Sequence, residues 1–516
     1  EGQGFESPRL HHLNPKQGLR CVCPWHVYRN VSTALFSSPG HPSSGKLEAA
    51  RDRLAVIRHP LERFFNTREV DRDPRLKIIL ACLLSYYYLT FYNWWHWAPS
   101  LSTLGNTTFD YVPAPVLQNM RWLVFLNYGQ TQVYMYFLGM LALLGLFSLF
   151  CLRSSLLAMC LLAILFVNKT YYYLDDIRLF HNFHHFHLFF TLVFLLSRDK
   201  LRFFRGALAV GYVMSAVVKF TPSWLQGEYF NSLPEKLPLF PKISWVVTVT
   251  GLSVVVMESL GPLIWFTSIG WLRRLSFAWF ILFHLYSGLL VAFWYPSLMV
   301  PLVVAAFWRF DRPLQAGYRF SRRDLAPLII CALVIFAGLY HYFLRGNVLL
   351  TSEGRYYGFY MYDANKQVTF DTEISKGNKT WKFEIFRPYQ TGATEEPDRD
   401  LSGRITYEFW QDGKLLRKSN LGHPIEDEGQ VVFNPSYFIK IEDRKYGDPY
   451  FYYFYARELM RRYHPDKMSL HLDIQINGRP ETTTLLDIPD FAKLNPTYSP
   501  FRHNDWVLIP GTNSAP

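Results

Sequence analysis

Cysteine is scarce in this sequence, with six among 516 residues, and the last of them is Cys331. The long segment after it therefore has no disulfide framework. Cys21 and Cys23 lie close together near the start, but no second cysteine pair completes a metal-binding spacing. The sequence indicates neither a disulfide-stabilised fold nor a cysteine metal site.

Acidic residues are fewer than basic ones, 41 against 53, which gives a formal net charge of +12. Such a charge could indicate a nucleic-acid partner, but many Lys and Arg lie in short loops between long apolar runs. That pattern is typical of the cytoplasmic loops of membrane proteins. Half of the residues are apolar, yet mean hydropathy is only +0.02, because polar flanks surround an apolar middle. We predict a membrane protein with no nucleic-acid partner.

The apolar middle predicts a polytopic α-helical membrane bundle of about nine spans. The predicted spans are approximately 78–97, 132–152, 155–174, 185–197, 206–220, 243–266, 275–294, 296–310 and 325–344. The predicted domains are a disordered tail (1–45), an amphipathic cytoplasmic segment (46–77), the bundle (78–345) and an extramembrane domain (346–516).

Basic residues predict the orientation of this multi-pass protein. The loops 198–205, 267–274 and 309–324, and the segment before the first span, are all rich in Lys and Arg. If nine spans cross the membrane in alternating directions, these four basic segments all lie on one side. By the positive-inside rule that side is the cytoplasm. The N-terminus is then cytoplasmic and the C-terminal region is lumenal or extracytoplasmic.

After residue 345 the pattern changes to alternating apolar and polar residues, as in half-buried strands. Such segments include VTFDTEI, TWKFEIF, RITYEFW, QVVFN and LHLDIQIN, while residues 449–463 (PYFYYFYARELMRRY) have a helical pattern. We predict a C-terminal extramembrane α+β domain that is mainly antiparallel β.

Two costly side chains mark a candidate site in the bundle. The spans 185–197 and 206–220 are joined by the basic loop RDKLRFFR, and the first begins at a histidine cluster while the second leads to Lys219. If this loop is the turn of a hairpin, His185 and Lys219 lie at similar depth near the opposite membrane face. Ionisable groups inside a bilayer are expensive and by default indicate a functional site. A desolvated lysine can act as a free amine base, although it can also simply extend to the membrane interface.

Other residues are candidates for the same pocket. His184 and His187 accompany His185, and the spacing of His181, His184 and His185 resembles one histidine box of the membrane di-iron enzymes. No further box appears, so no metal is expected. The remaining pocket candidates are Trp224, Glu228, the mid-span Glu258, which needs a partner, and His284.

The residues also resemble a known family. VVKFTPSWLQGEYF (217–230) is similar to the signature of the vitamin K-dependent gamma-carboxylase family and its bacterial relatives, the horizontally transferred transmembrane (HTTM) domain proteins. HHFHLFFTLVFLLS resembles that family's histidine-containing helix start, and FHLYSGLLVAF resembles its later Phe-His helix. In the C-terminal part, YGFYMYDANKQ, NGRP and DWVLIP resemble the bacterial members.

The resemblance implies a gamma-glutamyl carboxylase-like enzyme that uses reduced vitamin K or a related quinone, with O2 and CO2. It implies that Lys219 is the base and that His185 assists the carbanion chemistry. The implied partners are membrane lipid, the quinone and a glutamate-containing peptide. Three alternatives stay open: an HTTM-fold protein that binds or modifies a lipid or other substrate without glutamate carboxylation, a transporter or channel, and a di-iron enzyme.

Overall fold

The computed structural model describes most of the chain after residue 58. The described residues are 59–102, 113–118, 128–232, 243–290, 294–307, 320–354, 365–387, 405–420, 425–433 and 447–509. The chain divides into two units, Glu1–Leu61 and Glu62–Pro516, and the second contains both the helical part and the sheet. The predicted disordered tail and the start of the predicted amphipathic segment lie outside the described residues.

Helices form at every predicted span. They are α4 (Pro74–Ser102), α5 (Tyr128–Phe150), α6 (Ser155–Asp175), α7 (Asn182–Leu196), α8 (Lys200–Val217), α11 (Ser244–Ile264), α12 (Gly270–Leu290), α13 (Trp294–Phe307) and α14 (Leu325–Leu339). Shorter helices accompany them: α3 (Thr67–Arg72), η2 (Pro115–Leu117), η4 (Ile177–Leu179), α9 (Pro222–Leu225), α10 (Glu228–Ser232), η5 (Arg322–Asp324), η6 (Tyr340–Phe343) and α15 (Val348–Thr351).

Four helical segments in the described part of the chain are long and apolar enough to cross a membrane: Gln132–Phe150, Ser155–Asp175, Ser244–Ile264 and Arg322–Phe343. The helices α7 and α13 are apolar but have only 15 and 14 residues. The first turns of α8 carry Lys200, Arg202 and Arg205. The prediction of a helical membrane protein is consistent with this structure, whereas about nine spans is not confirmed.

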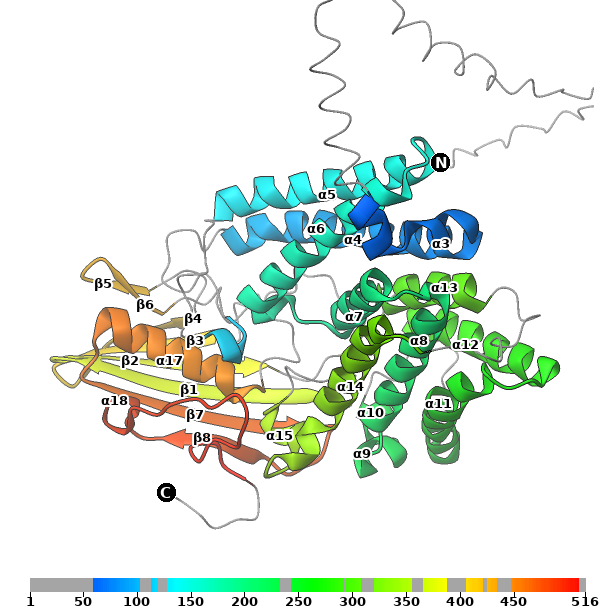
Figure 1. Ribbon diagram of the computed structural model, residues 1–516. Helices are drawn as coiled ribbons and strands as arrows, with labels where there is room; N and C mark the ends of the chain where they lie inside the picture. Colours follow the sequence, from blue (N-terminus) through cyan, green and yellow to red (C-terminus); the bar gives the residue numbers. More distant parts are fainter. Residues whose placement is uncertain are drawn as a thin grey trace, which may run out of the picture. The chain divides into compact units, whose positions relative to one another are not determined.

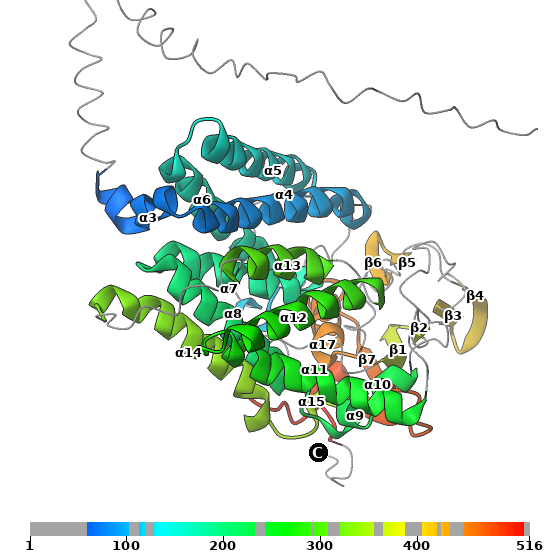
Figure 2. The same ribbon diagram turned by 90° about the vertical axis from the view of Figure 1, so that its right-hand side faces the viewer.

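The helices pack in two groups. In the first, α5 packs against both α4 and α6. In the second, α8 contacts α7, α11, α13 and α14, and α12 packs beside α11 and α13 (Figures 1 and 2). The helices α4 and α6 contact α7, which joins the two groups. The hairpin of α7 and α8 therefore lies at the centre of the helical part.

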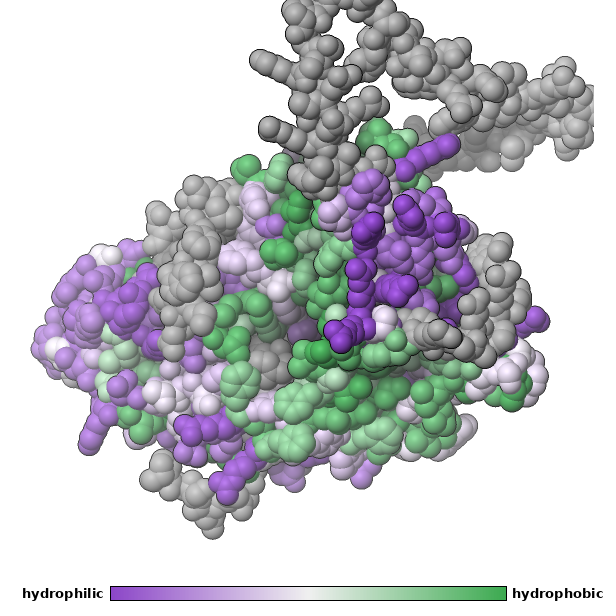
Figure 3. All heavy atoms as spheres, in the orientation of Figure 1, coloured by the Kyte–Doolittle hydropathy of each residue, from purple (hydrophilic) through white to green (hydrophobic). Residues whose placement is uncertain are grey.

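Large apolar side chains remain exposed on many of these helices. Examples are Trp245, Trp271, Leu282, Phe336 and Phe343. Figure 3 shows hydrophobic residues gathered over the helical part and mostly hydrophilic residues over the sheet. Exposed apolar area of this extent fits contact with lipid better than contact with water.

The C-terminal part contains an antiparallel sheet of six strands in the order β4-β3-β2-β1-β7-β8. A two-stranded sheet, β5 with β6, accompanies it. The strands are β1 (Lys366–Lys376), β2 (Lys379–Arg387), β3 (Ile405–Gln411), β4 (Lys414–Asn420), β5 (Ile425–Asp427), β6 (Gln430–Phe433), β7 (Lys467–Ile476) and β8 (Thr483–Ile488). Burial alternates along β1 and β7, as the sequence pattern predicted, and the predicted antiparallel β domain is confirmed.

The helix α17 (Pro449–Tyr463) covers one face of this sheet (Figure 1), and a short helix, α18 (Phe491–Leu494), comes after β8. The α17 helix starts where Asp448 caps the amide of Tyr450, with Pro449 in the first turn, and it ends at His464 in the left-handed region. Its aromatic residues fill the core, as where Tyr452 packs on Phe370 with ring centroids 4.2 Å apart. The predicted helix over 449–463 is confirmed.

Hydrogen bonds join the sheet to the segments between helices. Asn477 Nδ2 donates to Ser223 Oγ at 2.7 Å, and Asn365 Nδ2 donates to the Ser232 carbonyl at 3.2 Å. Tyr450 donates its hydroxyl to the Pro113 carbonyl at 2.8 Å. The turn after β7 therefore contacts the segment that comes directly after Lys219.

Candidate functional site

Lys219 lies just after the end of α8. Its amide donates to the Ala216 carbonyl at 2.9 Å, and its side chain is 2% exposed. The chain then turns at Thr221, whose hydroxyl accepts from the Trp224 amide, and Pro222 starts α9. The helix α8 packs against α11, which brings the Lys219 amine into an ion pair with Glu258. The sequence correctly anticipated that Glu258 needs a partner.

The Glu258 carboxylate is completely buried within α11. One of its oxygens, Oε2, accepts from Lys219, whereas Oε1 has no hydrogen-bond partner among the described residues. Buried polar atoms are nearly always paired in native proteins, so an unpaired carboxylate oxygen requires an explanation. It is a candidate acceptor for a substrate.

His284 on α12 belongs to the same region. Its Nε2 lies 2.5 Å from the Tyr212 hydroxyl, and both side chains are fully buried. Lys219 lies close enough to His284, and Glu258 close enough to Tyr212 and Tyr295, for their charges to interact. We call these five residues the Lys219 cluster.

Two further buried atoms of the cluster, His284 Nδ1 and the Tyr295 hydroxyl, have no hydrogen-bond partner among the described residues. The His284 ring is completely buried. The centroid of the imidazole lies 5.4 Å from that of the Tyr295 ring and 5.2 Å from that of the Phe283 ring. The cluster thus presents a carboxylate oxygen, an imidazole nitrogen and a tyrosine hydroxyl without hydrogen-bond partners among the described residues.

Trp224 covers the amine of Lys219, whose Nζ lies 5.5 Å from the centre of the indole ring. The indole Nε1 donates to the Gly251 carbonyl at 3.3 Å. A side chain at Gly251 would crowd this contact, because a Cβ there would lie 3.3 Å from the Trp224 carbonyl oxygen. Trp224 therefore lies beside Lys219.

Glu228 connects this region to the sheet. Its Oε2 accepts from Ser223 Oγ at 2.8 Å and from Arg479 Nη2 at 2.6 Å. Asn477, two residues before Arg479, also contacts Ser223. The described contacts of Glu228 therefore fix the α9–α10 segment that carries Trp224, and none of those contacts is with Lys219.

The predicted histidines have other neighbours. The ring of His185, which is partly buried, lies 5.0 Å from that of Tyr173 and 5.9 Å from that of Phe180. The buried His184 ring lies 5.1 Å from that of Trp94. The described partners of His185 thus differ from those of Lys219, and the shared cavity of the two stays a prediction. Within the described residues, no group of three or more His, Cys, Asp or Glu could hold a metal ion.

His187 pairs with a lysine that sequence reasoning missed. Its Nδ1 lies 2.8 Å from Lys169 Nζ, and its Nε2 lies 3.1 Å from the Leu83 carbonyl. Lys169 is fully buried on α6, and it also donates to Thr90 Oγ1 at 3.1 Å. A lysine inside the predicted span 155–174 was itself a signal, because charged groups in spans are costly.

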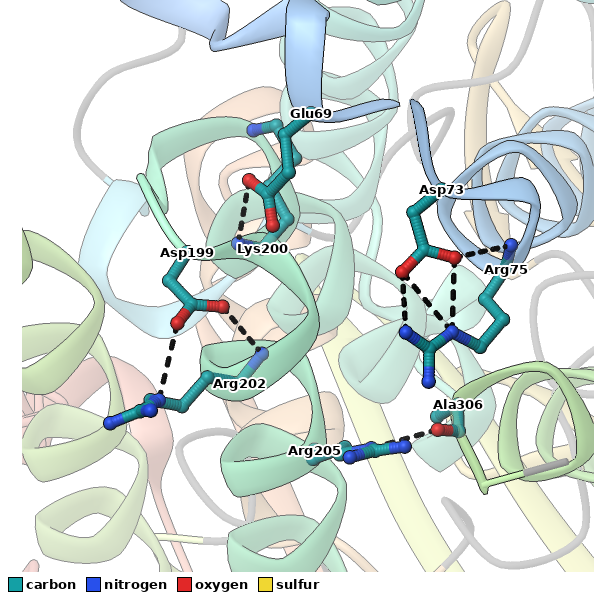
Figure 4. Close-up of polar contacts among 8 residues, drawn as sticks. All are labelled: Glu69, Asp73, Arg75, Asp199, Lys200, Arg202, Arg205 and Ala306. Carbon is teal, nitrogen blue, oxygen red and sulfur yellow. Dashed lines mark hydrogen bonds and ion pairs between the residues drawn. The ribbon is translucent and has the colours of Figure 1, made fainter. Parts of the chain in front are cut away.

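A third polar group lies at the far end of the α7–α8 hairpin (Figure 4). Lys200 Nζ donates to the carbonyls of Phe194 and Ser197, which are at the end of α7. Burial lowers the pKa of Lys200 to about 7, against the attraction of Glu69. Burial also raises the pKa of the Glu69 carboxyl to about 7, although that carboxyl accepts from the Lys200 amide.

Charged pairs surround this group. Asp199 caps α8 by accepting from the Arg202 amide, and Arg75 makes two-pronged contacts with Asp73 (Figure 4). Arg205 donates to the Ala306 carbonyl at 2.8 Å. The loop predicted to be basic thus forms a partly buried polar junction between α3, α7 and α8, with Lys200 at its buried centre.

No family model matches this chain, and neither a curated protein nor a solved structure matches it.

Proposed function

We propose that this protein is an integral membrane enzyme similar to the gamma-glutamyl carboxylases, with Lys219 as a base that acts on a reduced quinone. The observation that carries the proposal is the buried ion pair of Lys219 with Glu258, beside His284. A buried ionisable pair with an unpaired oxygen is costly to maintain for structure alone.

The unpaired atoms of the Lys219 cluster fit the hydroxyl group of a reduced quinone. Tyr212 can donate to Nε2 of His284, which leaves the ring hydrogen on the unpaired Nδ1. The site then offers a donor at His284, an acceptor at Glu258 Oε1 and the Tyr295 hydroxyl, which can do either. A hydroxyl group needs a donor and an acceptor, because its oxygen accepts one hydrogen bond while its hydrogen donates another.

The Lys219–Glu258 pair can accept one proton from a bound hydroxyl group, and the positive charge that the pair gains is balanced by the negative charge left on the hydroxyl oxygen. An amine and a carboxylate in contact are neutral as a pair, whichever of the two holds their shared proton. Transfer of a second proton from a weakly acidic hydroxyl breaks its O–H bond and leaves the electron pair on the oxygen, which becomes an anion. The pair is then a Lys219 ammonium beside a Glu258 carboxylic acid, with a net charge of +1. A base that is desolvated in this way suits general base catalysis.

A bound reduced quinone would supply, with O2, the strong base that removes a gamma proton from a glutamate before CO2 is added. His185 is assigned to the glutamate end of this reaction. The residue His185 is partly exposed, and its neighbour Phe180 packs against the core of the sheet. A peptide on the extramembrane side could therefore approach His185 more easily than the buried Lys219 cluster.

The proposal includes an orientation. The junction at Lys200, with its surrounding arginines, is at the cytoplasmic end of the α7–α8 hairpin. Lys219 and the sheet are then at the lumenal or extracytoplasmic end, and the N-terminus is cytoplasmic. Cysteine-accessibility labelling of exposed sites at Arg198 and Lys414 tests this orientation, because the two should react from opposite sides.

The test of function uses the purified full chain in liposomes with a glutamate-containing peptide, labelled bicarbonate, O2 and a reduced quinone. Vitamin K hydroquinone, menaquinol and ubiquinol are supplied in parallel. The expected result is label in the peptide that requires a reduced quinone and is lost in Lys219→Ala. Phe220→Ala is the matched control, because Phe220 is adjacent and 53% exposed.

Label that never enters the peptide with any of the three quinones rejects glutamate carboxylation. Label that persists in Lys219→Ala rejects the assigned base, even if carboxylation occurs. An unchanged elution volume must show that Lys219→Ala is folded before a loss of label is attributed to the missing base.

A further inference from the structure

A second buried amine lies apart from the Lys219 cluster. Lys169, on α6, is completely buried, and its Nζ contacts His187 of α7 and Thr90 of α4. The helices α4 and α6 both contact α7, so these residues lie where the two groups of helices meet. The reaction proposed for the Lys219 cluster uses none of them.

The contacts of Lys169 fit a neutral amine. Its Nζ donates to Thr90 Oγ1 at 3.1 Å and to His187 Nδ1 at 2.8 Å. The Thr90 hydroxyl gives its own hydrogen to the Tyr86 carbonyl, so toward Lys169 it is an acceptor. The ring hydrogen of His187 is at Nε2, which lies 3.1 Å from the Leu83 carbonyl, so Nδ1 is an acceptor too. These two contacts use both hydrogens of an NH2 group and leave its lone pair unused.

An ammonium would be poorly supported at this position. Among the described residues, the hydrogen-bond partners of Lys169 are Thr90 and His187, and neither is a carboxylate. Two tyrosine rings, those of Tyr86 and Tyr87, lie 5.4 and 5.3 Å from Nζ. Contact with aromatic faces returns less free energy than the burial of a charge without a counter-ion costs. The amine is therefore neutral, and a neutral amine is a nucleophile.

Two hydroxyl groups near the His187 ring lack hydrogen-bond partners. The Tyr87 ring lies 4.2 Å from that of His187 between centroids, and Thr191 is one turn further along α7. Both side chains are completely buried, and they lie close enough to each other to interact. Within the described part of the chain, however, neither hydroxyl has a partner with suitable hydrogen-bond geometry. Buried hydroxyls are nearly always paired, so these two indicate a bound group with acceptor oxygens.

Access restricts which compound can reach this amine. The side chains of Lys169 and His187 have no exposed area, so a large or charged ligand would require the helices to separate. CO2 is small and uncharged, so its entry into the interior carries no cost of desolvating a charge. It is also an electrophile that neutral amines attack, and its adduct has two oxygens that accept hydrogen bonds.

We propose that Lys169 is a modification site that binds CO2 covalently as a carbamate. The lone pair of Nζ forms the N–C bond, and one C=O electron pair moves onto an oxygen. One N–H hydrogen leaves as a proton and is accepted by His187 Nδ1, which is already within hydrogen-bond distance. The carbamate anion is then balanced by the imidazolium beside it, and the hydroxyls of Tyr87 and Thr191 can donate to its oxygens. The inference does not depend on the proposed carboxylation.

The experiment uses carbon NMR, because this readout needs no reagent to enter the interior. The full chain, with its lysines labelled at the side-chain nitrogen, is held in detergent micelles under carbon-labelled CO2. We expect a carbamate carbon signal that is split by coupling to a lysine nitrogen and that saturates as the CO2 pressure rises. The signal should be absent in Lys169→Met.

Two threonine variants test the role of the hydroxyls. Thr191→Val removes a hydroxyl that has no described hydrogen bond, so the melting temperature without CO2 should change little. The carbamate signal at a fixed CO2 pressure should nevertheless fall by about tenfold, because a hydrogen bond to an anion is lost. Thr170→Val is the matched control: Thr170 is adjacent to Lys169, but its hydroxyl donates to the Phe166 carbonyl, so the signal should be unchanged.

A nitrogen-coupled carbamate signal that Thr191→Val weakens and Thr170→Val does not supports the proposal. The proposal is overturned if no such signal appears at any CO2 pressure, or if the signal persists in Lys169→Met. Equal effects of the two threonine variants also overturn it. A melting temperature close to that of the unsubstituted protein shows that each threonine variant is folded.

Discussion

Lys169 Nζ lies 2.8 Å from His187 Nδ1 in the interior of the helical part. The imidazole Nε2 is within hydrogen-bond distance of the Leu83 carbonyl, so its hydrogen is on Nε2 and Nδ1 accepts from the amine. Two tyrosine rings, those of Tyr86 and Tyr87, lie 5.4 and 5.3 Å from the same amine. This is a lysine–histidine pair inside the bundle, but it is not the pair Lys219 and His185.

A double-mutant cycle measures the coupling of this pair. His187→Phe removes the acceptor from a buried amine, which should cost about 1–3 kcal/mol of unfolding free energy. Lys169→Met in the His187→Phe background should recover stability, because the unsatisfied amine is then gone. Thermal unfolding in one detergent measures all four proteins. Equal effects of Lys169→Met in both backgrounds contradict the coupling.

The helices and most strands were predictable because their signals are local. Apolar runs marked the positions of α4 to α8 and of α11 to α14, and alternation marked β1, β2, β3, β6 and β7. The start and end of α17 could be inferred from Asp448, Pro449 and the arginines of its last turn. The number of membrane crossings was less predictable, since short apolar helices such as α7 and α13 can be buried by neighbours without spanning.

The sequence identified which residues form the candidate site, because ionisable side chains inside a membrane span cost free energy. It did not identify which of these side chains contact each other. Lys219, Glu258, Trp224 and His284 were all expected in a pocket, and the structure brings them together. Which group pairs with which depends on how α8, α11 and α12 rotate against each other. Periodicity along one helix does not determine that rotation, so the hydrogen bond from Tyr212 to His284 was not predicted.

A second prediction concerns the ion pair of Lys219 with Glu258. Glu258→Leu leaves a buried amine without its counter-charge and should cost about 3–5 kcal/mol. The double variant Lys219→Met/Glu258→Leu should recover most of that loss, because it leaves no buried charge. Both variants should lack activity. The double variant should therefore be stable but inactive. A double variant as unstable as Glu258→Leu alone contradicts this explanation.

A third prediction is the pH dependence of stability at the junction in Figure 4. The pKa of the Glu69 carboxyl is raised from 4.5 to about 7, chiefly by burial, so between those values the folded state binds more protons than the unfolded state. This group's contribution to stability therefore falls as the pH rises from 4.5 to about 7. Glu69→Gln cannot ionise and should be free of that loss.

The measurement is the melting temperature at pH 5, 6 and 7. The melting temperature of Glu69→Gln minus that of the unsubstituted protein should increase over this series. Lys200 acts in the opposite sense and at higher pH: its pKa is lowered from 10.5 to about 7, so its contribution rises above pH 7. Glu426→Gln, at an exposed carboxylate, should show no such trend. A constant difference for Glu69→Gln contradicts the raised pKa.

A fourth prediction concerns the contact between Arg479 and Glu228. Their side chains are 46% and 26% exposed, so the ion pair itself should add little to global stability. Its effect should be local, because Glu228 also binds Ser223 in the segment that carries Trp224. Arg479→Glu should raise amide hydrogen exchange in residues 221–232 while the melting temperature changes little.

Charge exchange separates attraction between these two side chains from the loss of either one. In the double variant Glu228→Arg/Arg479→Glu the opposite charges face each other again, so exchange in residues 221–232 should return toward its original rate. Lys414→Glu is the control, since it reverses an exposed charge on β4 of the same sheet. If the double variant exchanges as fast as Arg479→Glu, the order of this segment does not depend on the ion pair. The hydrogen bond from Asn477 to Ser223 would then be the contact that holds the segment beside Lys219.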